Sequence, residues 1–423
     1  MAIKIMVVGG GGREHALVRA LLRSPQRPTV ICAPGNVGIA ADVEVLSEIS
    51  DGDVDAIVTA AGQHAIDLVV VGPEVPLVAG LCDALAEAGI AAFGPSRAAA
   101  QLEGSKAYAK EIMAAAGVPT AAHRMVETVA QGMEAIGAKY PVVIKADGLA
   151  AGKGVVIAED QDQARAALEA MIVDRQFGDG PVLVEEFLVG EELSLLALCD
   201  GVRAVPMAPA QDYKRIYDGD LGPNTGGMGS YSPVVGIDDA RCAEIVAAVH
   251  QPVVDLLAAR GTPFHGVLYA GIMLTADGPS VLEFNTRFGD PETQAILPRL
   301  RSDLVEVLLA ATQTGGLAEV ELEFDDRWAV TVVLASRGYP VSSSSGDVIS
   351  GLAEVASDVE VTHAGTAYVA GEFVTAGGRV LNVTALGVSP SAARDGAYAG
   401  AEMIKFNGRQ LRRDIALRAV ERA

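Results

Sequence analysis

The sequence predicts a multidomain protein of mixed α/β and α+β class that begins with an open parallel sheet. Its 423 residues exceed what one ordinary hydrophobic core accommodates, so we expect two to four domains. Strand and helix signals alternate over residues 1–102, which is typical of a parallel α/β sheet. After Trp328 the pattern changes to short strands with Gly, Ser and Thr turns. We therefore assign an N-terminal α/β domain to 1–102, a central domain to 103–328 and a small β-rich domain to 329–423.

The composition narrows the class of function. Half of the residues are hydrophobic and the formal net charge is -22. Such an acidic chain is a poor general binder of nucleic acid or anionic membranes, although a local basic pocket could still hold a phosphorylated substrate. The N-terminus lacks the pattern of a signal peptide and no apolar run reaches transmembrane length, so we expect a soluble, cytoplasmic protein. Reduced, buried thiols are expected for the four widely spaced cysteines, Cys32, Cys82, Cys199 and Cys242.

The N-terminal domain should contain strands at 3–8, 29–33, 65–71 and 89–93, with an amphipathic helix at 14–23. Each strand ends in a turn that contains Gly or Pro: GGGG, APGN, VGPE or FGPS. Ligands of parallel sheets bind at the carboxyl ends of the strands, so these turns are candidate ligand contacts.

The run GGGGREHAL at 9–17 follows a strand and opens a helix. Glycines there let backbone N–H groups approach a phosphate at the positive end of the helix, and we favour a phosphate or phosphoribosyl ligand. A nicotinamide dinucleotide fits less well, because GxGxxG would place Glu14 or His15 on its third glycine and no acid ends the second strand. A tight turn without a ligand is the other alternative. The candidate substrate contacts of this domain are Gly10, Gly11, Gly12, Arg13, Asn36 and Glu74.

The central domain contains a second glycine-rich loop. PVVIKADGLAAGKGVVIA at 141–158 predicts a strand, a loop and a strand. Lys145 beside GLAAGKG suits the phosphates of a nucleoside triphosphate, because backbone amides and an ammonium together neutralise the phosphate oxygens. The loop is not a Walker A sequence, since Gly154 stands where Ser or Thr is required, and a simple hairpin is the alternative.

Residues 120–195 should form a small α+β unit after a helix at 105–117. Within it, EEFLVGEE at 185–192 could offer a strand edge to adenine and a carboxylate to ribose hydroxyls, or it could be a solvated acidic turn. The rest of the chain should contain a long polar loop (211–231), a helix (238–259), a strand pair (267–285), a helix (303–311) and a C-terminal helix (391–404).

The stretch LEFNTRFGDPETQ at 282–294 ends a predicted strand with polar groups. Side chains alternate between the two faces of a strand. Leu282 and Phe284 should therefore enter the core, while Glu283 and Asn285 point the other way.

Several motifs resemble the phosphoribosylamine–glycine ligase family of the broader ATP-grasp group. The central ones are VIKADGLAAGKGV, EEFLVGEELS, GPNTGGMGSYSP and LEFNTRFGDPETQ, and GGGGREHAL, APGNVG, VGPEVPL and FGPSRAAAQLEGSKAYAK match the N-terminal half. Their order agrees with the family over nearly the whole chain. The resemblance implies an ATP-grasp core with a mobile lid at 120–195. It also implies ATP-dependent ligation of glycine to 5-phosphoribosylamine through a glycyl phosphate, giving glycinamide ribonucleotide, ADP and phosphate in purine biosynthesis.

The resemblance also implies a role for each candidate residue. ATP phosphates would contact Lys106, Lys145 and the loop residues Gly148, Gly152, Lys153 and Gly154. Adenine and ribose would contact Glu185, Glu186, Leu188 and Glu192. The reacting substrates would meet near Asp212, Lys214, Asn224, Thr225, Arg287 and Asp290. Lys145 and Arg287 would act in catalysis by neutralising charge on the transferring phosphoryl group.

The implied metal is Mg²⁺ or Mn²⁺, held by Glu283 and Asn285, whose hard oxygens suit such an ion. The preceding strand VLYAGIML contains no acid, so these two side chains are the whole protein contribution unless another segment supplies a ligand. The partners are glycine and 5-phosphoribosylamine, and the chain is expected to be a monomer or homodimer. Alternatives are another ATP-grasp carboxylate–amine ligase or carboxylase, and a nucleotide-binding regulator without turnover.

Overall fold

In the described part of the chain, residues 2–149 and 154–423, five parallel strands form the N-terminal sheet of the computed structural model. Their order is β3-β2-β1-β4-β5, which confirms the predicted open parallel sheet. After β1, the chain adds β2 and β3 on one side of this strand and then β4 and β5 on the other. The loops after β1 and β4 therefore lie at a topological switch point. The strands are β1 (Lys4–Gly9), β2 (Thr29–Pro34), β3 (Glu44–Val45), β4 (Leu68–Val71) and β5 (Ala91–Phe93).

Both faces of this sheet are buried, which explains the unbroken apolar run of β1. Ile5 and Val7 belong to the core on the α1 side, whereas Met6 and Val8 belong to a second core with α3 and α5. The helices are α1 (Gly12–Leu22), α2 (Ile39–Asp42), α3 (Val54–Gln63), α4 (Glu74–Ala79), α5 (Leu81–Glu87) and α6 (Gln101–Gly104).

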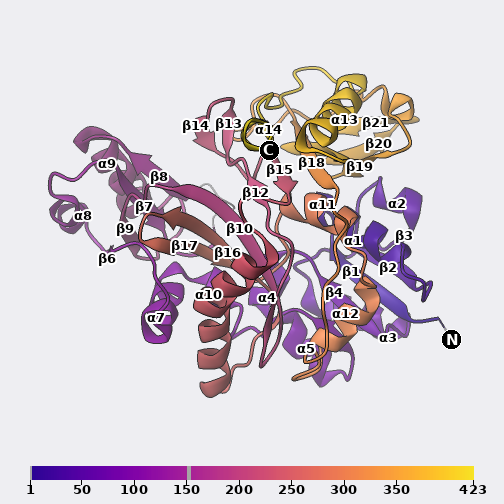
Figure 1. The fold of residues 1–423 in the computed structure, drawn as a ribbon, viewed down its shortest axis with the longest axis horizontal. Helices are drawn as coiled ribbons and strands as arrows, with labels where there is room; N and C mark the ends of the chain where they lie inside the picture. The colour runs from indigo at the N-terminus through magenta and orange to yellow at the C-terminus, as the bar shows by residue number, and fades with distance from the viewer. Residues whose placement is uncertain (1, 150–153) are drawn as a thin grey trace.

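A four-stranded antiparallel sheet, in the order β6-β9-β7-β8, forms the lid unit. Figure 1 shows it at the left, on the far side of the molecule from the N-terminal sheet. The lid follows α7 (Lys106–Ala116), which ends at Gly117 with φ of 69° in the left-handed region. Its elements are β6 (His123–Val126), α8 (Val129–Ile136), β7 (Val142–Ala146), β8 (Val155–Ala158), α9 (Gln161–Leu168), a π turn (Glu169–Val173) and β9 (Val182–Glu186).

The core sheet of the central domain has the order β11-β10-β16-β17. The chain passes from the lid sheet to this sheet between Glu186 and Glu191, so the predicted lid end near residue 195 falls inside a core strand. Helix α10 (Asp239–Ala259) is long and apolar enough to cross a membrane by composition. Its apolar residues, however, share the buried core of α7 and this sheet. The strands are β10 (Glu191–Asp200), β11 (Ala204–Pro206), β16 (His265–Thr275) and β17 (Gly278–Asn285).

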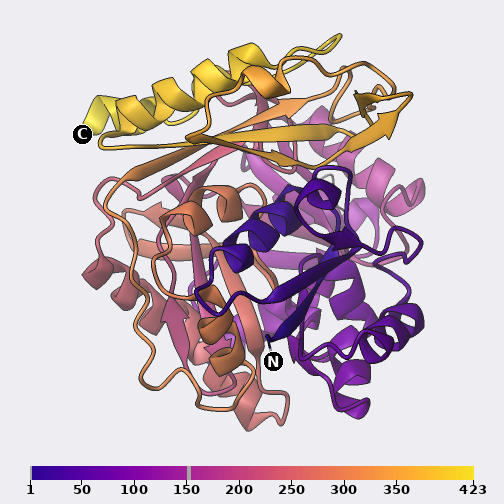
Figure 2. The ribbon, with the colours of Figure 1, turned by 90° about the vertical axis from the view of Figure 1, so that its right-hand side faces the viewer.

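The third large sheet joins the central domain to the C-terminal domain. Its antiparallel strands have the order β12-β15-β18-β22-β19, and α13 lies over them along the top of Figure 2. The predicted loop at 211–231 is therefore wrong, because it contains β12 (Gln211–Asp212), β13 (Arg215–Tyr217), β14 (Leu221–Asn224) and β15 (Gly229–Ser232). The end of this polar segment, β15, pairs with β18 about a hundred positions later, a pairing that no local pattern reveals.

The remaining elements complete the C-terminal domain and its junction with the N-terminal sheet. They are α11 (Glu292–Ile296), a 3-10 turn (Leu297–Arg299), α12 (Leu304–Ala311), β18 (Trp328–Ala335), a 3-10 turn (Leu352–Glu354), β19 (Val359–His363), β20 (Thr366–Val369), β21 (Glu372–Thr375), β22 (Arg379–Gly387), α13 (Pro390–Met403) and α14 (Leu417–Arg422).

Candidate active site

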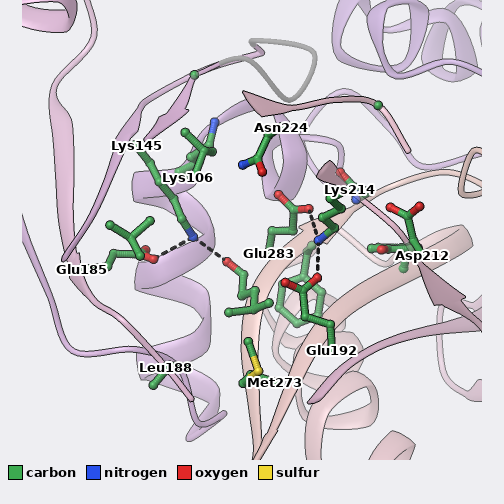
Figure 3. Close-up of a pocket in the computed structure, with 18 of the residues that line it drawn as sticks. Lys106, Lys145, Glu185, Leu188, Glu192, Asp212, Lys214, Asn224, Met273 and Glu283 are labelled. Carbon is green, nitrogen blue, oxygen red and sulfur yellow. Dashed lines mark hydrogen bonds and ion pairs between the residues drawn. The ribbon is translucent and has the colours of Figure 1, made fainter. Parts of the chain in front are cut away.

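A cavity of about 710 Å³ lies where the lid sheet, the core sheet and the N-terminal loops meet, and Figure 3 shows part of its lining. Most of the candidate residues line it: Arg13, Glu74, Lys106, Lys145, Gly148, Gly154, Glu185, Glu186, Leu188, Glu192, Asp212, Lys214, Asn224, Thr225, Glu283, Asn285, Arg287 and Asp290. Gly10 and Asn36 line a second cavity of about 470 Å³ instead. Gly152 and Lys153 lie outside the described residues.

Two lysines share one buried glutamate at the lid end of the cavity. Lys145 on β7 lies 2.7 Å from one carboxylate oxygen of Glu185 and donates to the carbonyl of Leu282 at 3.0 Å (Figure 3). Lys110 on α7 lies 2.8 Å from the other oxygen of Glu185. Burial opposes the charge of Glu185, but the two ammonium groups outweigh burial and lower its pKa. Sequence reasoning missed Lys110, although its position one helical turn after Lys106 was an available signal.

Lys106 lies at the start of α7 and points to the glycine-rich loop. Its ammonium donates to the carbonyl of Gly148 at 2.8 Å, and its backbone N–H donates to Asp147 at 2.5 Å. Burial lowers the pKa of Lys106. Glu186 turns away from these lysines, because its carboxylate accepts the Ala122 N–H at 3.0 Å.

A β-bulge in β17 changes the predicted alternation of side chains. Gly271 of β16 pairs with Glu283, but the next residue, Ile272, pairs with Val281, so Leu282 is the extra residue. Val281 and Phe284 therefore enter the core, while Leu282 lines the cavity. The prediction for Leu282 was wrong, and that for Phe284 is confirmed.

Glu283 and Asn285 both line the cavity near the end of β17, as expected for two oxygen donors to one cation. Lys214 lies 3.6 Å from Glu283 and 3.2 Å from Glu192 (Figure 3). Among the described residues, no group of three His, Cys, Asp or Glu side chains could by itself hold a metal ion. The donor pair therefore fits Mg²⁺ only if a substrate or water supplies the remaining oxygens.

Arg287 is held between two carboxylates from the N-terminal half of the chain. Its guanidinium lies 3.2 Å from Glu74 and 2.9 Å from Glu103. Burial opposes the charge of Arg287, but Glu103 and Glu74 outweigh it and raise its pKa. Glu103 also accepts the backbone N–H of Thr286 at 2.7 Å, so it fixes both the arginine and its chain. Sequence reasoning missed Glu103, which lies within the quoted motif FGPSRAAAQLEGSKAYAK.

In the glycine-rich turn after β1, the backbone N–H of Gly11 finds its hydrogen-bond acceptor in the first turn of α1. The N–H of Gly11 donates to Glu14 at 2.6 Å, and Arg13 pairs with the other oxygen of Glu14 at 2.6 Å. A Cβ on Gly12 would lie 2.1 Å from the amide nitrogen of Asn382 on β22. The turn is thus packed against the C-terminal domain, and of its residues 10–13 Arg13 is the one that lines the main cavity.

Asn36 is a bridge between domains in this structure. Its side-chain amide donates to the carbonyls of Gly10 at 2.9 Å and His363 at 2.8 Å. Its oxygen accepts the N–H groups of Gly38 and Ile39. These four bonds use the full hydrogen-bonding capacity of the side chain, which leaves none for a sugar hydroxyl.

The C-terminal domain contributes Arg379, at the start of β22, and Arg418 to the cavity lining, and Arg379 holds Asp290. It lies 3.0 Å from the Asp290 carboxylate and donates to the Asp290 carbonyl at 2.8 Å and to the carbonyl of Gly226. Sequence reasoning missed Arg379, because it is 89 positions from its partner and sits in no recognisable motif. Thr225 holds the backbone of Lys214 through two hydrogen bonds to its carbonyl.

Two further carboxylates of the cavity lining, those of Asp212 and Glu292, form no ion pair among the described residues, whereas Lys214 pairs with Glu192 and Arg379 with Asp290. Glu292 is buried and accepts hydroxyl hydrogen bonds from Ser194 at 2.9 Å and Tyr269 at 3.0 Å. One oxygen of Asp212 is sealed from solvent without a hydrogen-bond partner. Burial and the Glu292 charge raise the pKa of Asp212. A ligand ammonium at this site would offset the repulsion between the two acids and favour the charged form of Asp212.

Comparisons with known proteins match the whole architecture. Three family models of phosphoribosylglycinamide synthetase match the chain: the N domain matches residues 3–103, the ATP-grasp (A) domain 104–293 and the C domain 329–418. The phosphoribosylamine–glycine ligases of Streptomyces coelicolor and Agrobacterium fabrum are 51% and 46% identical, each over 99% of both chains. The crystal structure of phosphoribosylamine–glycine ligase from Thermotoga maritima is 36% identical with a TM-score of 0.84, covering 98% of this chain and 100% of that one. A biotin carboxylase domain from Hydrogenobacter thermophilus, solved with MgADP and bicarbonate, has a TM-score of 0.71 at 16% identity, covering 96% and 91%, and shares the fold.

Proposed function

The chain belongs to the phosphoribosylglycinamide synthetase family, and from that premise we propose that its cavity joins glycine to 5-phosphoribosylamine at the expense of ATP. A carboxylate is a poor electrophile, so glycine must first take the terminal phosphoryl group of ATP to become an acyl phosphate, releasing ADP. The amine of phosphoribosylamine then attacks the acyl carbon, phosphate leaves, and the amine loses a proton. The observation that carries this proposal is that two lysines, two oxygen donors and Arg287 face one cavity that reaches the N-terminal loops.

We assign the phosphate end of ATP to Lys106 and Lys145. The Lys106 ammonium lies against Gly148 of the glycine-rich loop, and Glu185 holds the Lys145 ammonium in the same cavity. Phosphoryl transfer depends mainly on positioning and charge neutralisation, which two preplaced ammonium groups supply. Leu188 and Glu192 line the neighbouring part of the cavity and remain our candidates for adenine and ribose contacts.

Glu283 and Asn285 would hold Mg²⁺ or Mn²⁺. Both are hard oxygen donors on adjacent parts of one strand end, and the rest of the coordination shell would come from nucleotide phosphates and water. A bound divalent cation would neutralise charge on the β- and γ-phosphates. Arg287, fixed by Glu74 and Glu103, would neutralise charge on the transferring phosphoryl group.

Glycine is recognised, in this proposal, by its two charges. Its ammonium would lie against Asp212 and Glu292, the acids without a cationic partner among the described residues, and its carboxylate would face Arg287. The orphan oxygen of Asp212 favours this orientation, because an ammonium would supply the missing donor. Phosphoribosylamine would enter from the N-terminal side, near Arg13 and Arg379.

The lid would close during the reaction, because the acyl phosphate hydrolyses when water reaches it. We place one hinge at the segment that follows α7, near Gly117, and the other at the passage from β9 to β10. We also propose a cytoplasmic location, since all four cysteines are free and buried as expected of reduced thiols.

Substrate omission tests the function. ADP release by the purified protein should require glycine and phosphoribosylamine together, and the product should have the mass of glycinamide ribonucleotide. ADP release supported by bicarbonate or D-alanine in place of glycine would overturn the proposal in favour of another ATP-grasp ligase or a carboxylase.

A further inference from the structure

Lys214 occupies an unusual place in the cavity. Its ammonium lies 3.2 Å from Glu192 and 3.6 Å from Glu283, and Figure 3 shows it between them. The first carboxylate is a candidate ribose contact and the second is the candidate metal ligand. One protein cation therefore neutralises two acids that a nucleotide and a metal ion would use.

The position of the ammonium has an electrostatic consequence. A unit positive charge 3.6 Å from a Glu283 oxygen repels any divalent cation that approaches that carboxylate.

The backbone of Lys214 is held by hydrogen bonds, whereas its side chain is only partly buried. The carbonyl of Lys214 accepts two hydrogen bonds from Thr225, at 2.7 Å from the backbone N–H and 2.9 Å from the hydroxyl. The side chain itself is 27% exposed, and its two carboxylate partners are 43% and 39% exposed. Ion pairs that keep this much contact with solvent are weaker than fully buried ones.

We propose that Lys214 is an internal counter-ion that keeps Glu283 from binding a divalent cation until a nucleotide is present. This inference rests on the proposed function only for the assignment of Glu283 as a metal ligand. The nucleotide phosphates offer the ammonium a more highly charged partner than Glu283. Lys214 then moves to the phosphates, and Glu283 is released to the metal that enters with them. The protein therefore couples metal entry to nucleotide entry.

Direct binding of Mn²⁺ without nucleotide tests this inference, with electron paramagnetic resonance of free Mn²⁺ as the readout. Lys214→Met and Lys214→Gln should each bind Mn²⁺ at least about tenfold more tightly than the wild type, because each removes a unit charge next to a ligand. Lys214→Arg keeps the charge and should resemble the wild type. Using two neutral variants keeps the test decisive if one of them does not fold.

Lys110→Met is the matched control. It also removes one lysine charge from the cavity lining, but Lys110 pairs with Glu185 and not with Glu283. Its Mn²⁺ affinity without nucleotide should equal that of the wild type. Adding Glu283→Ala to Lys214→Met should abolish the new binding, and adding a non-hydrolysable ATP analogue should restore tight Mn²⁺ binding to the wild type.

Equal nucleotide-free Mn²⁺ affinity in the wild type and both neutral variants would overturn the counter-ion role. A gain of affinity that survives Glu283→Ala would overturn it as well, because the ion would then sit elsewhere. Neither result bears on the substrate-omission test, in which the wild-type requirement for glycine and phosphoribosylamine is measured separately.

Discussion

Replacing Glu185 with glutamine should unbalance the charges at the lid end of the cavity. The Glu185 side chain is 2% exposed and lies 2.7 Å from Lys145 and 2.8 Å from Lys110, so Glu185→Gln leaves two buried ammonium groups around a neutral amide. Removing one partner of a buried ion pair costs about 3–5 kcal/mol. We expect the lower end, because Lys145 keeps its bond to the Leu282 carbonyl. For a domain of the size of the central domain (103–328), a loss of about 3 kcal/mol lowers the melting temperature by about 6–12 °C.

Calorimetry at neutral pH measures this loss, and a second variant tests its cause. The double variant Glu185→Gln/Lys110→Met has the same net charge as the wild type, so it should regain part of the stability that Glu185→Gln loses. Glu185→Gln should also bind an ATP analogue about tenfold more weakly, because Lys145 loses the group that orients it. A melting temperature equal to that of the wild type, or a double variant less stable than Glu185→Gln, would refute the reasoning.

The pH dependence of this effect has a definite sign. The folded-state pKa of Glu185 lies below its ordinary value of 4.5, since the two lysines outweigh burial. Its stabilisation is therefore fully present above pH 4.5 and is lost as the pH falls through the folded-state value. The melting temperatures of wild type and Glu185→Gln should differ by a constant amount near neutral pH and converge in acid.

Other substitutions test other parts of the site. Glu283→Ala or Asn285→Ala should lower kcat by about 100-fold or more and raise the magnesium concentration needed for turnover, and wild-type kinetics in either variant would sink the metal assignment. Arg379→Ala should lower kcat/KM for phosphoribosylamine by about 10–100-fold, the equivalent of one charged hydrogen bond, with an unchanged KM for ATP. Gly12→Ala should destabilise the protein by about 1–3 kcal/mol through its clash with Asn382, measured by thermal unfolding, and adding Asn382→Ala should recover part of the loss.

Local sequence patterns predicted many of the strands and helices correctly. The apolar run before GGGG became β1, and the helix expected at 105–117 became α7 (Lys106–Ala116), because each segment has a clear local signal and ends at glycine. The segment 211–231 was missed because its strands pair with β18 and with each other rather than forming an apolar stripe. The bulge at Leu282 was missed for a related reason, since it depends on the register with β16 and not on the composition of β17.

The candidate site could be predicted where its residues cluster in motifs. Lys145, Glu283 and Arg287 all face the main cavity, as their motifs suggested. Glu103 and Arg379 complete that cavity from segments far away in the chain, and only the folded chain brings them to Arg287 and Asp290. The fold also separates residues that stand close together in one motif. Arg13 lines the main cavity, whereas Gly10 lines the second.

Transfer of oxygen from glycine to phosphate tests the central proposal most directly. The proposal makes the glycine carboxylate attack ATP and then lose one carboxylate oxygen with the leaving phosphate. Glycine labelled with ¹⁸O in both carboxylate positions should therefore deliver one ¹⁸O to each molecule of inorganic phosphate, as measured by mass spectrometry after one round of ligation. Unlabelled phosphate formed together with the amide product would contradict an acyl phosphate route and, with it, the role assigned to this cavity.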